Sequence, residues 1–545
     1  MKRVASAIQW LQNAGYVCAK FILFAFLFAH KAVAQQMITE LKYDPRQIKH
    51  ILVWEYVPAD GGIVIAIMKP KKGLTLEKYD QSHKLQWEIA IGREQEYKEP
   101  VALMVIKDMI YLFFAETKGI RYLVYLWKVK KDKTVLIRDQ ELFEVKADQI
   151  IPKVSYSPNR EWGAMFLVER RLLGALSRDS LALSYYLAGP AGESKGVWRI
   201  PQYQTQIFGH PAIDNQGNFY AIMATIDSRK LKTDLSVLRY VPSHGLTLAA
   251  PIPLPERNYA NSAQIFLTDT VITLVALIAR GESEYKDGKP STILLSKIKM
   301  PGFFVANTSI YQHDSVRSVS NTFMREAGKA LRYTGNVTVY FYKLYVNHLY
   351  PQSDGKYVVV CESYAGPSGH SLQSDYRHDI SYGSNGYYVG TGNIYLFLLD
   401  NAGRVIKADT VKKSRSISTT PGSSSSRFPI MNEAGPYLLH IPLDDGHSTS
   451  YSLFRKGDRL YFLYVSTFRD RKDEARLYLT IYDMKGGNIL KTIEVMGTDY
   501  ERLYKFYRPW TRQVSEDEFI AVFDKFGKDP ETLIRRYRLP SDHAD

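Results

Sequence analysis

The side chains best suited to chemistry gather in one short stretch of the chain. Nineteen residues there combine histidines, carboxylates, an arginine and tyrosines, separated by glycines: His370, Asp375, Tyr376, Arg377, His378, Asp379, Tyr382, Tyr387 and Tyr388. A histidine beside a carboxylate can bind a divalent cation or exchange protons, and a tyrosine ring can stack on a sugar. We take these residues as the candidate ligand site and assign no metal or other cofactor to it. A solvated polar loop is the alternative.

The sequence offers no strong catalytic motif beside these residues. It lacks the H-E-x-x-H zinc motif, the P-loop, the G-x-S-x-G elbow, paired C-x-x-C motifs, an EF-hand loop and the sialidase box. The carboxylates of Glu169, Glu362 and Asp379 fall near the ends of expected strands or loops, but sequence spacing does not define their mutual distances. The common enzyme families are therefore disfavoured. A glycan-active enzyme, which needs only a few carboxylates or histidines, remains an alternative function.

The first 34 residues have the three parts of a secretory signal peptide. Lys2 and Arg3 give a basic start, residues 21–29 form an apolar core, and Ala32-Val33-Ala34 supplies small residues for cleavage. Nine apolar residues are too few to span a bilayer, for which about 20 are needed. We therefore predict cleavage after Ala34, export to the periplasm or beyond the cell, and no transmembrane segment afterwards. A buried helix or a retained anchor would be the alternatives.

Cleavage would change both the charge and the cysteine content. The segment 1–34 holds four basic residues and no acidic one, so the formal charge falls from +15 to +11 and the mature chain stays basic. Cys361 becomes the only cysteine, which rules out an intramolecular disulfide. An exported chain of this size must then be held together by its hydrophobic core.

A second notable stretch, "LYKFYRPWTR" at residues 503–512, alternates aromatic and basic side chains. In a cytoplasmic protein this mixture would suggest nucleic-acid binding, because bases stack on aromatic rings while cations hold phosphates. Export argues against nucleic acid as a partner. A strand at the edge of a sheet with a Pro-Trp turn explains the pattern, and an anionic glycan or lipopolysaccharide surface would suit it if it is exposed.

The rest of the chain consists of short apolar segments separated by clusters of Gly, Pro, Asn, Asp and Lys, which indicates an all-β protein. The 39 tyrosines favour the same class, because tyrosine suits a half-buried strand. One exception is residues 321–333, where Asn321 can cap a short helix with Met324, Ala327 and Leu331 on one side.

Several segments repeat one hairpin layout: an apolar strand, an Asp, a turn of three or four residues, and a more polar strand. Clear copies lie at residues 74–91, 394–411 and 477–495, and looser ones at 122–139 and 235–252. The Asp side chain can accept hydrogen bonds from the backbone of its own turn, and a later Gly tolerates positive φ. Self-similarity at a spacing of about 50 to 60 residues favours a β-propeller.

A second repeated element is a Pro and a polar turn that introduce a strand apolar on both faces, at residues 156–169, 210–225 and 350–364. Such strands belong inside a sheet that is packed on both sides. These strand starts resemble the "SPDG" starts of TolB-like bacterial β-propellers, although the full SPDG does not occur. Together with the leader, the Tyr-rich strands are similar to exported propellers of Bacteroidetes-type bacteria, a resemblance that brings no known site with it.

We therefore predict a signal peptide at 1–34 and one β-propeller at 35–545, with seven or eight four-stranded blades and a helical insertion at 321–333. Irregular insertions are expected at 303–335, 365–392 and 414–429, and residues 37–43 are expected to pair with the C-terminal strand to close the ring. A series of β-sandwich domains is the structural alternative. The oligomeric state is left open.

The sequence favours an exported, non-catalytic propeller that binds a protein or glycan of the bacterial envelope through loops on one face. The alternative function is a glycan-active hydrolase or lyase with a site at the mouth of the propeller channel. Two carboxyl groups about 5 to 10 Å apart in a pocket lined by Tyr or Trp would favour the enzyme.

Overall fold

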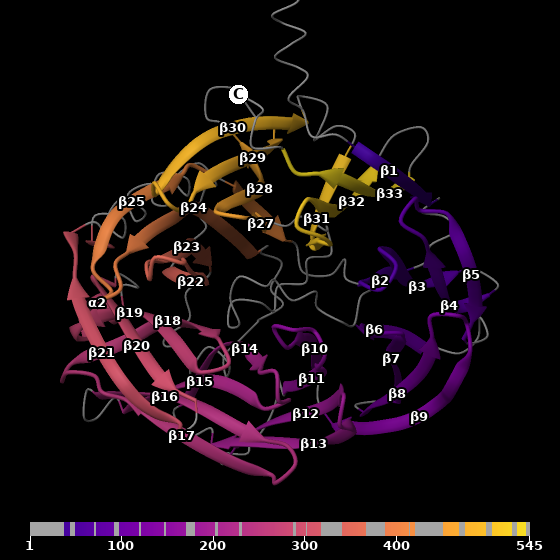
Figure 1. Cartoon of the computed structure of the whole chain (residues 1–545), viewed down its shortest axis with the longest axis horizontal. Helices are drawn as coiled ribbons and strands as arrows, with labels where there is room; N and C mark the ends of the chain where they lie inside the picture. Colours follow the sequence, from indigo (N-terminus) through magenta and orange to yellow (C-terminus); the bar gives the residue numbers. More distant parts are fainter. Residues whose placement is uncertain are drawn as a thin grey trace, which may run out of the picture.

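The computed structural model of the chain describes residues 37–43, 50–69, 72–91, 98–118, 121–146, 149–170, 180–201, 205–227, 232–286, 290–300, 302–314, 316–317, 341–366, 387–413, 415–419, 451–467, 475–496, 504–525 and 531–540. Within these residues the strands form eight sheets arranged as a ring, which makes the protein an eight-bladed β-propeller (Figure 1). The prediction of an all-β propeller is confirmed, with the larger of the two expected blade counts.

The blades follow one another along the chain, each with its first strand nearest the ring axis. Blade 1 contains β2 (His50–Val57), β3 (Gly62–Lys69), β4 (Gly73–Tyr79) and β5 (Leu85–Ala90). Blade 2 contains β6 (Lys98–Ile106), β7 (Met109–Lys118), β8 (Arg121–Lys130) and β9 (Val135–Lys146). Blade 3 contains β10 (Gln149–Tyr156), β11 (Gly163–Arg170), β12 (Ser180–Gly189) and β13 (Gly192–Pro201). Blade 4 contains β14 (Thr205–Ile213), β15 (Phe219–Asp227), β16 (Lys232–Val241) and β17 (Leu246–Ile252).

The second half of the ring repeats this order. Blade 5 contains β18 (Asn258–Leu267), β19 (Val271–Arg280), β20 (Thr292–Lys299) and β21 (Phe304–Gln312). Blade 6 contains β22 (Phe341–Pro351), β23 (Tyr357–Gly366), β24 (Tyr387–Leu399) and β25 (Val405–Val411), with β26 (Arg415–Thr419) also paired to β24. Blade 7 contains β27 (Tyr451–Lys456), β28 (Arg459–Thr467), β29 (Ala475–Asp483) and β30 (Asn488–Met496). Blade 8 contains β31 (Tyr504–Gln513), β32 (Glu518–Lys525) and β33 (Glu531–Arg538).

The two ends of the chain meet in blade 8, where β1 (Met37–Tyr43) is the outermost strand. It pairs antiparallel with β33, with Leu41 opposite Ile534, as the sequence predicted. The Arg535 side chain also donates to the Glu40 carboxylate at 2.6 Å. The first strand therefore closes the ring onto the last blade.

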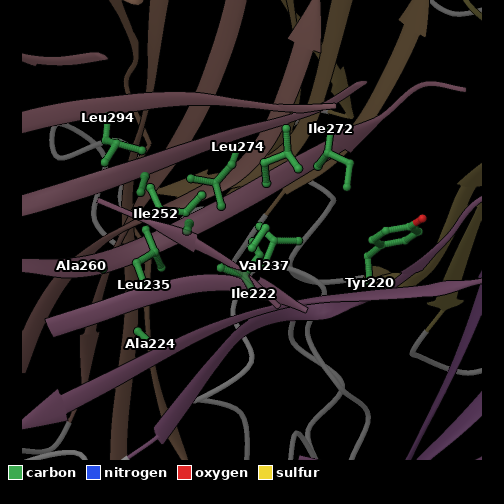
Figure 2. Close-up of a cluster of buried hydrophobic side chains, with 14 of the residues drawn as sticks. Tyr220, Ile222, Ala224, Leu235, Val237, Ile252, Ala260, Ile272, Leu274 and Leu294 are labelled. Carbon is green, nitrogen blue, oxygen red and sulfur yellow. The ribbon is translucent and has the colours of Figure 1, made fainter. Parts of the chain in front are cut away.

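The hydrophobic core is divided among the interfaces between neighbouring blades, and one cluster of buried side chains lies at each of the eight interfaces of the described ring. Figure 2 shows the cluster between blades 4 and 5, where Ile222 and Val237 lie with Ile272 and Leu274. A middle strand is therefore buried on both faces, which explains why its sequence is apolar without alternation.

The predicted hairpins join the third and fourth strands of their blades. In the turn between β24 and β25, the Asp400 Oδ1 atom accepts the N–H groups of Ala402 and Arg404 at 2.9 and 2.8 Å. Gly403 in this turn has a φ of +92°, which glycine adopts without strain. The turn chemistry inferred from the repeated Asp is confirmed.

The direction of the strands defines two faces of the ring. In a four-stranded meander, the turns after the first and third strands lie at one end of the ring axis, and the remaining connections lie at the other. We call these the turn face and the connection face. All inner strands consequently run toward the turn face, so residues near their C-terminal ends gather around the axis on that face.

Several segments with irregular composition contain regular strands. Residues 304–312 form β21 and residues 415–419 form β26, while β23 and β24 extend into both ends of the segment 365–392. Polar strands at the rim of a blade lack the apolar pattern of central strands, so the sequence pattern predicts insertions in their place. The predicted helix at 321–333 lies outside the described residues. A short helix that was not predicted, α2 (Gly281–Lys286), follows β19.

His83, in the turn between β4 and β5, leads to a prediction about acid stability. Its ring is buried, neither ring nitrogen has a hydrogen-bond partner, and burial together with the charge of Arg536 lowers its pKa from 6.5 to about 4. Between pH 6.5 and 4, the unfolded chain binds a proton at His83 and the folded chain does not. The free energy of unfolding is therefore unaffected by this histidine above pH 6.5 and decreases as the pH falls toward 4. The maximum loss is about 3 kcal/mol.

Substituting His83 by Asn is therefore expected to flatten the loss of stability between pH 6.5 and 4, measured by urea unfolding at several pH values. Asn tolerates the φ of +59° at this position. His244→Asn, at an exposed position in the corresponding turn of blade 4, is the matched control. Parallel curves for wild type and H83N would contradict the prediction.

Candidate functional site

Five side chains from three blades lie near the ring axis on the turn face, in two groups that we together call the arginine–aromatic cluster. Trp54 and Glu55 lie near the end of β2 in blade 1, and Arg512 lies near the end of β31 in blade 8. Tyr156 ends β10 in blade 3, and Arg160 follows in the next turn. Blades 8 and 1 come from opposite ends of the chain and meet where the ring closes, so closure brings Arg512 to Trp54 and Glu55.

Arg512 is held on two sides. Its Nη1 atom donates to the Glu55 Oε2 atom at 2.8 Å, and its guanidinium lies 5.5 Å from the centroid of the Trp54 ring. Trp54 is buried in the core cluster between blades 8 and 1, so it forms a rigid support. The Arg512 side chain nevertheless remains 40% exposed, which leaves its cation accessible from solvent.

Glu55 is engaged through both of its oxygen atoms. Besides the bond from Arg512, its Oε1 atom accepts the backbone N–H of Tyr56 at 3.0 Å, and its side chain is only 3% exposed. A carboxylate held in this way positions a cation. It is poorly placed to protonate a substrate.

The other half of the cluster is Tyr156 with Arg160. The Tyr156 hydroxyl oxygen accepts the backbone N–H of Val105 in blade 2 at 3.1 Å, and the Arg160 guanidinium lies 5.1 Å from the Tyr156 ring centroid. Burial raises the pKa of Tyr156, and the nearby charge of Glu55 raises it further, against the opposing charges of Arg512 and Arg160. The hydroxyl therefore stays protonated at neutral pH and can serve as a hydrogen-bond donor.

The cluster is suited to recognition. Arginine presents a planar fork that binds carboxylate or sulfate groups through paired hydrogen bonds, and an aromatic ring beneath it restricts its orientation. Tyrosine rings supply flat apolar surfaces for stacking. Tyr156 stays protonated at neutral pH, and the Glu55 carboxylate is engaged by Arg512 and the Tyr56 N–H.

A second polar cluster lies between blades 6 and 7 and is inaccessible. The Lys413 ammonium, after β25, forms an ion pair with the Glu362 carboxylate on β23, and neither side chain is exposed. The Asn347 Nδ2 atom, at a β-bulge in β22, donates to the Tyr451 hydroxyl at 3.0 Å, and the Lys413 N–H donates to the Asn393 Oδ1 atom at 2.9 Å. We regard this buried pair as structural.

The residues predicted as the ligand site fall mostly outside the described part of the chain. This applies to His370, Asp375, Tyr376, Arg377, His378, Asp379 and Tyr382. Tyr387 and Tyr388 lie in β24, where they pair with Thr419 and Ser418 of β26, and their side chains are not described. The proposed ligand-binding role of this stretch remains a prediction.

The other sequence candidates have different outcomes. Glu362 lies in the buried ion pair, and Glu169 lies in β11 with a side chain that is not described. The aromatic and basic stretch 503–512 lies mainly in β31, an inner strand, and contributes Arg512 to the cluster. The prediction of an edge strand is confirmed, because β31 is the inner edge of blade 8. The predicted Pro-Trp turn is wrong, since Pro509 and Trp510 lie within β31, at a break in its pairing with β32.

Sequence reasoning missed Glu55 and Arg160. A single charged residue inside the apolar strand "HILVWEYV" was the available signal for Glu55, because a buried charge needs a partner. Arg160 lies in a polar turn where arginine is unremarkable. Among the described residues, no group of three or more His, Cys, Asp or Glu side chains is arranged to hold a metal ion. No helix in those ranges is long and apolar enough to cross a membrane.

The comparisons with known proteins do not assign a function. No protein-family model matches the chain, and no curated protein sequence matches it. The polysaccharide lyase Uly1 has a similar structure, with a TM-score of 0.37 and 10% identity over 83% of this chain and 92% of that chain. Prolyl oligopeptidase B from Galerina marginata gives a TM-score of 0.37 and 7% identity over 88% of this chain, which spans 56% of the peptidase chain. The WD40 domain of SCAP from fission yeast gives 0.34 and 6% identity over 93% of this chain and 99% of that domain.

Proposed function

We propose that the protein is exported and acts as a non-catalytic binding module of the bacterial envelope, with a protein or glycan as its ligand. The observation that carries this proposal is the arginine–aromatic cluster. Arg512 and Arg160 lie over aromatic rings and remain accessible, while the Glu55 carboxylate is engaged in holding Arg512. Such groups bind a polar ligand without supplying an acid or a base for its turnover.

The proposed location has its support in the sequence. The basic start, the short apolar core and the small residues before Gln35 form a leader of the secretory type. The mature chain would carry a formal charge of +11, which favours anionic surfaces such as those of the bacterial envelope. Fractionation of cells that express the full chain should find it outside the cytoplasm, with Gln35 as its first residue.

Binding can be tested with the purified chain that begins at Gln35. We expect it to retain a ligand on a glycan array or in a pull-down from solubilised envelopes, and to release no new reducing ends or unsaturated sugars from glycans. Turnover of a glycan combined with blank results in both binding assays would overturn the proposal in favour of a glycan-active enzyme.

Arg512→Gln is expected to weaken binding of the captured ligand about tenfold. A hydrogen bond to a charged group contributes about 1.5–3 kcal/mol, and 1.4 kcal/mol corresponds to a factor of ten. Arg138→Gln is the matched control, because Arg138 lies 5.6 Å from the Trp127 ring centroid and is exposed on the outer strand β9. Equal binding by the two variants would contradict a role for the cluster. Thermal unfolding should confirm that R512Q is folded, since Glu55 loses its cation in this variant.

A further inference from the structure

A third arginine extends the arginine–aromatic cluster toward blades 6 and 7. Arg455 lies near the end of β27 in blade 7, is exposed, and holds its guanidinium 5.8 Å from the ring centroid of Tyr350 in blade 6. The Arg455 N–H donates to the Gln513 Oε1 atom at 2.8 Å, and the Gln513 Nε2 atom donates to the Arg455 carbonyl at 2.6 Å. Gln513 follows Arg512, so Arg455 is tied directly to the cluster.

The three arginines share one arrangement. Arg455 and Arg512 lie at the C-terminal ends of inner strands, and Arg160 lies in the turn that follows another inner strand. All three are therefore on the turn face, and each guanidinium lies 5.1 to 5.8 Å from the centroid of an aromatic ring. The positions come from blades 3, 7 and 8, so the cations are distributed along an arc around the axis.

Three carboxylates in the turns next to these arginines are paired with lysines. Glu161 lies 3.5 Å from the Lys107 ammonium, Asp517 lies 2.6 Å from that of Lys456, and Asp458 lies 2.6 Å from that of Lys485. Glu161, Asp458 and Asp517 follow Arg160, Arg455 and Arg512, respectively, by a few residues. Among the described residues, each of these acids has a lysine as its ion-pair partner. The charges of these three acids are compensated by lysines, which leaves Arg160 and Arg455 cationic, while Arg512 also pairs with Glu55.

We propose that Arg160, Arg455 and Arg512 together bind an anionic polysaccharide chain across the turn face. This inference rests on the proposed binding function and names its ligand class. A guanidinium binds a carboxylate or sulfate group through two parallel hydrogen bonds, and the aromatic ring beneath it restricts its orientation. Because the cations are spread over several blades, a ligand that engages all of them must carry repeated charges, as a polyuronate or sulfated glycan does.

The test uses three purified probes with the chain that begins at Gln35, measured by isothermal titration calorimetry. Oligogalacturonate supplies carboxylates, dextran sulfate supplies sulfates, and unmodified dextran is the neutral control. We expect binding of at least one anionic probe, no binding of dextran, and an affinity that falls as NaCl is raised. The anionic probe that binds more tightly identifies the preferred group.

Arg160→Gln and Arg455→Gln are each expected to raise the dissociation constant of that probe about tenfold, and the double variant about a hundredfold. Both arginines are exposed, so the variants should fold like the wild type, which thermal unfolding checks. Arg138→Gln, the same arrangement on an outer strand, should change the constant less than twofold. An equal effect of R138Q, or none from R160Q and R455Q, would overturn the inference.

The inference and the proposed function can fail separately. If no anionic probe binds while the envelope pull-down captures a protein in an Arg512-dependent manner, the polysaccharide inference is overturned and the binding function stands. If dextran binds as tightly as the charged probes, the ligand is a neutral glycan and the inference again fails. If the probes, the glycan array and the pull-down all yield no ligand, both proposals fail.

Discussion

Replacing Lys413 by methionine is expected to lower the free energy of unfolding by about 3–5 kcal/mol. Methionine fills a similar volume but leaves the Glu362 carboxylate in the interior without its cation, since both side chains are completely buried. The Asn347 amide nitrogen, which donates to the Glu362 Oε2 atom at 3.5 Å, carries no charge and does not replace the lysine cation. Urea unfolding of the purified variant measures the effect.

Two further variants separate the loss of the ion pair from other effects of the substitution. Lys412→Met, at the exposed neighbouring position, should leave the stability within about 0.5 kcal/mol of wild type. Replacing both Lys413 and Glu362 by methionine should recover most of the lost stability, because no buried charge then remains uncompensated. A K413M variant as stable as K412M would show that Glu362 does not depend on Lys413.

The sequence predicted those features of the fold that depend on neighbouring residues. The hairpin at 394–411 was recognised because the Asp400 turn contains its own hydrogen-bond acceptors and its own glycine, so its geometry is encoded locally. The doubly apolar strands β11, β15 and β23 were recognised because each is packed on both faces. The repetition of these two local signals along the chain predicted the propeller fold.

The arginine–aromatic cluster could not be predicted in the same way. Arg512 and Glu55 are 457 residues apart in sequence and meet only after the ring has closed. Nothing near Arg512 in the sequence identifies Trp54 as the ring beneath it. The stretch 503–512 could be recognised as unusual, but its partner lies on another blade. The irregular segment 365–392 attracted attention because local composition is the only information that a sequence offers about a site of this kind.

Ring closure links stability to the candidate site. Tyr43, at the end of β1, places its hydroxyl 2.7 Å from the Glu77 Oε2 atom and 2.8 Å from the Tyr79 hydroxyl, both on β4 of blade 1. Leu41 packs on the core cluster between blades 8 and 1, which also contains Trp54. The strand that closes the ring therefore supports the interface on which Arg512 and Trp54 meet.

Removing β1, so that the chain begins at Asp44, is expected to lower the free energy of unfolding by about 5 kcal/mol or more. The chain loses the hydrogen-bond ladder to β33 at about 1 kcal/mol per bond, together with the partial burial of Leu41 and Tyr43 at about 1 kcal/mol each. This is a large part of the 5–15 kcal/mol typical of a folded domain. Thermal and urea unfolding should show a lower midpoint, and the exposed edge of β33 should promote association.

A synthetic peptide of residues 35–48 distinguishes closure from general damage. Added to the chain that begins at Asp44, it should restore the unfolding midpoint in a concentration-dependent manner, because it can pair with the free edge of β33. The same peptide with Leu41→Asn keeps the backbone ladder but loses the apolar contact, so it should restore less. Because closure also aligns Arg512 with Trp54, ligand binding should return together with stability. Restored stability without restored binding would place the ligand site away from the interface of blades 8 and 1.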